Sequence, residues 1–101
     1  MADRPVACTL SPAALQARRE NLLHVLLRRT MERRELPNGY SLQFAAENGV
    51  LSEIARTVEN ERHCCRFLRV GVTVEPDGGP ITVEFTGPAG TKVFLAAMFD
   101  F

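Results

Sequence analysis

Three cysteines are the residues of this sequence best suited to chemistry: Cys8 and the adjacent pair Cys64 and Cys65. Thiolates select soft metal ions and metalloids over harder ions. Neighbouring side chains on a helix diverge by about 100°, so the pair alone is poorly placed to chelate one ion, and a third donor is needed. Cys8 is the only other thiol. The pattern predicts a soft-metal site of Cys8, Cys64 and Cys65, and the alternative is that the thiols only pack in the core.

Charged residues on two expected helix faces predict a buried ion pair. Arg19 falls in the middle of the apolar arc of the first helix, and Glu61 falls between Ile54 and Leu68 on the second. A charge in such a place needs a partner, and a pair between Arg19 and Glu61 would satisfy both. The alternative is that Arg19 extends along the surface with only its stem buried.

A glycine-containing segment, residues 87–92 (GPAGTK), opens the last expected helix. Free backbone N–H groups at a helix start can hold an anion, so Gly90 and Lys92 form a candidate anion site. The segment is not a P-loop, because its glycine spacing is too short and no Ser or Thr follows Lys92. A strand-ending glycine before a helix-starting proline is the alternative explanation.

Helical spacing of apolar residues predicts the elements that position these candidates. Ser11 and Pro12 are typical of a helix start, and the apolar period extends that helix over about 12–28. A second helix is expected over about 50–67, which would carry Glu61 and the cysteine pair, and a third from Pro88 onward.

Alternating apolar and polar residues predict two hairpins, each with a Pro-Asx-Gly turn. The segment 30–36 is a poorly patterned strand expected at the sheet edge, and 40–44 is its partner. The segments 70–74 and 81–85 form the clearer hairpin. A short fifth strand near Cys8 is a further possibility.

The order helix, hairpin, helix, hairpin, helix predicts the α+β class: a single four-stranded antiparallel sheet with helices packed on one face. With 101 residues and 46% hydrophobic content, we expect one domain over residues 1–101. Helices packed antiparallel would bring Cys8 near the end of the second helix, where Cys64 and Cys65 lie.

Composition and charge bound the environment and the partners. No apolar run approaches the length of a membrane span, and the opening residues lack the order of a signal peptide, so we expect a cytoplasmic protein with reduced thiols. Residues 1–34 hold seven Arg against three acids (+4), and the rest hold five basic against nine acidic groups (−4). This polarity and the apolar ending 98–101 predict a homodimer. Nucleic acid is not expected, because no recognised binding motif is present.

A spaced pattern also carries a family resemblance: Glu61-Arg62-x-Cys64-Cys65-x-Phe67-Leu68, then Thr86-Gly87-Pro88-x-Gly90-x-Lys92-x-Phe94-Leu95, with Cys8-Thr9-Leu10-Ser11 upstream. The chain resembles a group of small bacterial proteins with no assigned reaction, some of them associated with heavy-metal-resistance gene neighbourhoods. The resemblance directs attention to Cys8, Glu61, Cys64 and Cys65. The chain departs from the pattern at Arg66, where Pro or a small residue is expected.

The leading hypothesis is a small cytosolic accessory protein that binds a soft metal ion or metalloid through cysteine thiolates; the sequence identifies no cofactor beyond this candidate ion. The alternative is a homo-oligomeric protein-interaction module with structural cysteines and no catalytic activity. An enzyme comes third. Arg62 and His63 could stabilise a thiolate, but no full set of acid, base and nucleophile can be assembled.

Overall fold

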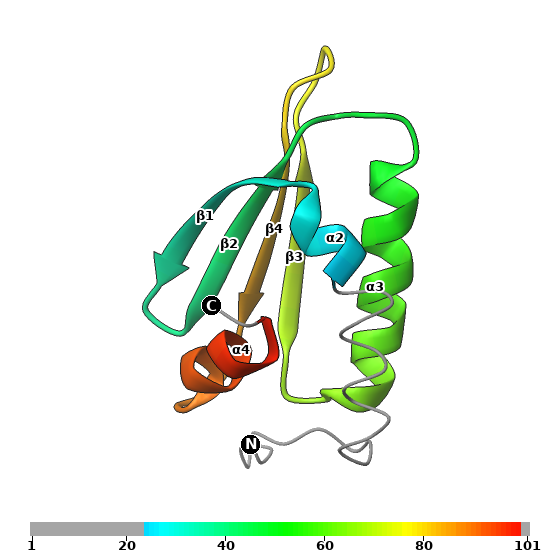
Figure 1. Ribbon diagram of the computed structural model, residues 1–101. Coiled ribbons are helices and arrows are strands. Elements are labelled where there is room, and N and C mark those ends of the chain that lie inside the picture. The colour runs from blue at the N-terminus through cyan, green and yellow to red at the C-terminus, as the bar shows by residue number, and fades with distance from the viewer. Residues whose placement is uncertain (1–23, 100–101) are drawn as a thin grey trace.

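One antiparallel sheet forms the centre of the computed structural model, which describes residues 24–99 (Figure 1). Within that range the strands are β1 (Thr30–Leu36), β2 (Gly39–Phe44), β3 (Arg69–Val74) and β4 (Ile81–Thr86), and their order across the sheet is β1-β2-β4-β3. Each hairpin supplies one edge strand and one central strand, and the hairpins join where β2 pairs with β4. The predicted α+β class and four-stranded antiparallel sheet are confirmed, and β1 lies at an edge as expected.

The helices of the described range are α2 (His24–Arg28), α3 (Val50–Cys64) and α4 (Thr91–Phe99). The helix expected over 12–28 is described only in its last part, which is α2. The second helix ends at Cys64 rather than near residue 67. Cys65 leaves the helical region (φ −107°, ψ 76°), while its N–H still donates to the carbonyl of Glu61 at 2.7 Å. The additional fifth strand considered near Cys8 lies outside the described residues.

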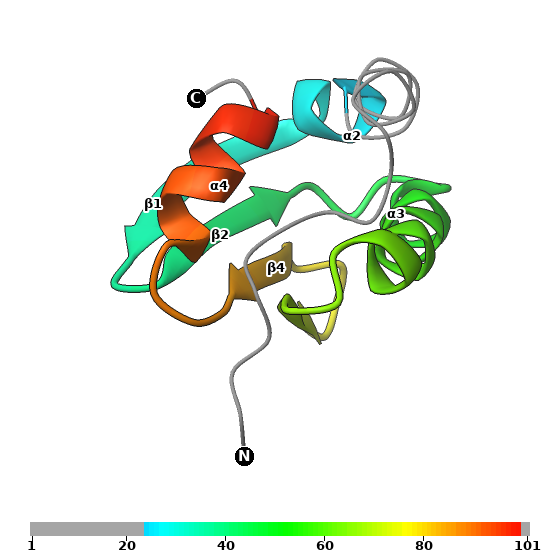
Figure 2. The same cartoon turned by 90° about the horizontal axis from the view of Figure 1, so that it is seen from below.

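The last helix begins three residues later than its proline suggests. Pro88 opens a turn, in which the N–H of Thr91 donates to the carbonyl of Pro88 at 3.1 Å. Gly90 has a φ of 96°, a conformation that favours glycine, so the regular helix starts only after it. Figure 2 shows α4 lying along the β1–β2 side of the sheet, and α3 lying beside α2.

The core lies on one face of the two central strands. Leu42 and Val83 are paired across β2 and β4, and both are fully buried. Alternate residues of both strands share this burial, as their period of two predicts: Tyr40, Phe44, Ile81 and Phe85. The helices contribute Leu26 from α2, Val50 and Ile54 from α3, and Leu95, Met98 and Phe99 from α4 to the same cluster. Each large apolar side chain buried here stabilises the fold by about 1.5–3 kcal/mol.

Candidate functional site

The cysteine site is described only in part. Cys65 is 1% exposed, forms no disulfide and belongs to the hydrophobic core. Cys64 is the last residue of α3, and neither its thiol nor Cys8 lies among the side chains that the structure describes. Within the described part of the chain, no group of three or more His, Cys, Asp or Glu side chains could hold a metal ion. Convergence of the three thiols therefore stays a prediction, and burial of Cys65 fits a packing role.

Glu61 is the buried charge of α3. Its side chain is 1% exposed, and it lies on the same helical face as Ile54 and Thr57, which are also buried. The neighbouring Arg62 is exposed instead. Its Nη1 lies 3.6 Å from the Oε2 of Glu59, which is three residues earlier on the helix surface. Arg19 lies outside the described residues, so the Arg19–Glu61 pair is a prediction for which the structure supplies a buried carboxylate.

The predicted anion site at Gly90 and Lys92 already contains a carboxylate partner. The Lys92 Nζ lies 2.9 Å from the Glu35 Oε1 and 6.0 Å from the centre of the Tyr40 ring. The hydrogen bond and the charge of Lys92 lower the pKa of Glu35 below its ordinary value. Lys92 thus ties α4 to the β1–β2 hairpin, and an external anion at this place would compete with Glu35.

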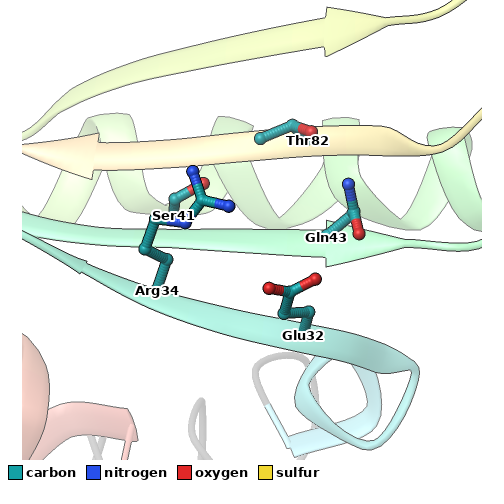
Figure 3. Close-up of a pocket in the computed structure, with 5 residues that line it drawn as sticks. All are labelled: Glu32, Arg34, Ser41, Gln43 and Thr82. Carbon is teal, nitrogen blue, oxygen red and sulfur yellow. The ribbon is translucent and has the colours of Figure 1, made fainter.

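A hollow lies on the sheet face opposite the core, and sequence reasoning did not single it out (Figure 3). It is lined by polar residues from three adjacent strands: Glu32, Arg34, Ser41, Gln43 and Thr82. Glu32 is paired with Gln43, and Gln43 with Thr82, so these side chains form one row across the sheet. The hollow has a volume of about 70 Å³ and is open to solvent, so it is well below the size of a typical small-molecule pocket. The alternating polar positions of β2 and β4, Ser41, Gln43 and Thr82, were the available signal.

The two edges of the sheet differ in a way that the sequence pattern did not reveal. Edge strand β1 has an irregular register at Met31, typical of a bulge, and four consecutive charged residues, 32–35. Such features prevent another strand from pairing with an edge. Edge strand β3 has a regular register, no charge after Arg69, and two exposed valines, Val72 at 43% and Val74 at 56%. Among the strands of residues 24–99, β3 is paired only with β4, so within the described part of the chain its outer edge is open to strand pairing.

Comparisons of the chain with family models, with curated proteins and with solved structures find no match. None of the helices in residues 24–99 has the length and apolar character needed to cross a membrane.

Proposed function

We propose that this protein is a homo-oligomeric interaction module with structural cysteines and no catalytic activity. The observation that carries the proposal is the contrast between the sheet edges. The edge at β1 has charges and an irregular register, whereas the edge at β3 exposes Val72 and Val74. Exposed apolar side chains beside free backbone groups favour association through a strand edge.

Two further observations support an interaction role. Cys65 is packed in the core, which suits a structural thiol rather than one held open for a ligand. The polar hollow at Glu32 and Arg34 is smaller than a typical small-molecule pocket and open to solvent, which leaves this face of the sheet free to contact a macromolecular surface. We further propose that all the helices pack on one face of the sheet. The opposite face, which carries the polar hollow, then remains exposed to solvent in the oligomer.

Sedimentation velocity of the full chain over a range of concentrations tests the proposal. We expect a dimer that dissociates to monomer on dilution, because one strand edge is a small interface. A chain that stays monomeric at high micromolar concentration contradicts the proposed function.

Soft-metal binding through Cys8, Cys64 and Cys65 is the competing proposal. It is independent of self-association, because it requires the thiols and not the sheet edge. A titration of the native chain and of a variant without thiols separates the two proposals.

A further inference from the structure

Alternate residues of β3 direct their backbone N–H and C=O groups to the outer edge of the sheet. The N–H of Glu75 donates to the carbonyl of Pro80 at 3.4 Å, which continues the register in which Val74 is paired with Ile81. In an antiparallel pair, successive residues point their N–H and C=O groups alternately toward the partner strand and away from it. The backbone N–H of Glu75 points toward β4. The backbone N–H and C=O groups of Val70, Val72 and Val74 therefore point away from β4, in the plane of the sheet, where no strand of the described chain pairs with them.

The charges around β3 are arranged symmetrically about Val72. Arg69 lies three residues before it and Glu75 three residues after it. If two copies of β3 pair antiparallel with Val72 opposite itself, Val70 lies opposite Val74 and Arg69 lies opposite the partner's Glu75. The three valines whose backbone groups point away from β4 then all lie in hydrogen-bonded pairs. Each of the three pairs exchanges two N–H···O=C bonds, which gives about six new backbone hydrogen bonds. Charge, side-chain pairing and backbone direction agree on this one register.

We infer that β3, which lies at one edge of the sheet in Figure 1, pairs with β3 of a second copy of this chain about a two-fold axis at Val72, so that two four-stranded sheets become one continuous sheet. The inference rests on the proposed function and names its contact surface. Val72 and Val74 share a sheet face with the buried Val83 and Ile81, so pairing extends the apolar face of one sheet into that of the other. A formal net charge of zero leaves no overall repulsion between copies.

A second copy fits this edge better than an unrelated extended peptide. Any peptide could satisfy the outward backbone groups, but only a strand with a positive and a negative end in reversed order matches both charges of β3. The strand itself has that property. Residues 1–23 of the same chain and a foreign peptide are the other occupants, and the experiment below distinguishes them from a second copy.

Charge reversal at the two ends of β3 is the sharpest test. The variants R69E and E75R each place like charges opposite one another twice in the symmetric dimer. We expect each to raise the dimer Kd by roughly ten-fold to a hundred-fold, and less so at high salt. Mixing the two variants restores both opposite-charge pairs in a heterodimer, and the double variant restores them in a homodimer. Recovery in both cases is specific to the proposed register.

A substitution on the axis and a matched control complete the design. V72K places two lysines opposite each other at the two-fold axis and should abolish the dimer. V93K makes the same change at a side chain of α4 that is 76% exposed, and should leave the dimer unchanged. Circular dichroism checks that each variant is folded. All residues changed are exposed, so the fold should persist.

The outcomes separate failure of the inference from failure of the proposed function. A native monomer contradicts both. A native dimer that persists in R69E, E75R and V72K contradicts the β3 register but leaves the proposed function in place, as expected if residues 1–23 or another ligand occupy this edge. Loss of the dimer in R69E and E75R without recovery on mixing also contradicts the register.

Discussion

Substitution of Gly39 by Ala tests how closely β2 and β4 approach at the first residue of β2. A Cβ atom added to Gly39 would lie 2.8 Å from the carbonyl carbon of Phe85 and 3.1 Å from the Cα of Thr86, and it would overlap the carbonyl oxygen of Phe85. These are backbone atoms of a central strand, so no side chain can rotate to relieve the overlap. Gly39 is paired with Thr86, and Ala at this position must push the two strands apart.

The cost follows from what the separation disturbs. Overpacking at a tight site costs about 1–3 kcal/mol, and each ladder hydrogen bond lost between β2 and β4 adds about 1 kcal/mol. Phe85 is also held in the core against Phe99, with ring centres 5.3 Å apart, so a shift of its backbone disturbs packing on α4. We expect a total loss of about 3 kcal/mol, against a domain stability of about 5–15 kcal/mol. For a domain of this size that lowers the Tm by roughly 12–24 °C.

Gly71→Ala is the matched control in the same sheet. A Cβ atom there would have only the Oε1 of Glu84 near it, at 4.0 Å, which is an ordinary contact. Because Ala restricts the unfolded chain more than Gly, we expect this variant to match the native chain or gain about 0.4–1 kcal/mol. Thermal unfolding followed by circular dichroism at low protein concentration compares the two. Melting temperatures of the two variants within about 2 °C of each other would refute the close approach of β2 and β4.

Three further predictions test the buried charge, the hairpin ion pair and the thiols. Glu61→Gln should lower the free energy of unfolding, measured in urea, by roughly 3 kcal/mol, because breaking a buried pair leaves the other charge buried without a partner. The surface control Glu59→Gln should lower it by less than about 0.5 kcal/mol. Similar losses in the two variants contradict the buried pair. Because Lys92 lowers the pKa of Glu35 in the folded state, the stability from this contact is present at neutral pH and is lost as the pH falls from the ordinary glutamate range through the lowered folded-state value. Glu35→Gln should flatten the pH dependence of unfolding in that window, and an unchanged curve refutes the contact. If the thiols form a metal site, competition titration with Zn²⁺, Cu⁺, Hg²⁺ and arsenite should give dissociation constants below about 10 μM. These constants should rise as the pH falls, because ligation requires thiolates. A variant with all cysteines changed to Ser should not bind, and equal binding by both chains rejects the site.

Local periodicity predicted the central strands and much of α3. Leu42 and Val83 alternate with polar neighbours in the sequence, and the structure buries them on the core side of the sheet. The 3.6-residue period marked Glu61 as a charge on an apolar face, and it is buried. These predictions succeed because the direction of each side chain along a strand or helix depends only on the geometry of consecutive residues.

Element ends and the candidate surfaces were harder to predict. Apolar residues continue the helical pattern of α3 to Leu68, but the backbone leaves the helix at Cys65 to enter β3, a choice that depends on where the strand must begin. The hollow at Glu32 and Arg34 exists only because β1 pairs with β2, and β2 with β4, in this register. No single segment contains it.

By itself, the sequence determined the class of the fold, the two hairpins and the face of each central strand that is buried, because these follow from backbone periods and turn residues within short segments. Only the tertiary structure decided that β4 is central and β3 is an edge. Val72 and Val83 have the same alternating context in the sequence, yet Val83 is fully buried and Val72 is 43% exposed. The difference arises because β2 pairs with β4, bringing Gly39 against Thr86 across nearly half the chain. Which strand is left with a free edge depends on that long-range pairing, and local patterns carry no information about it.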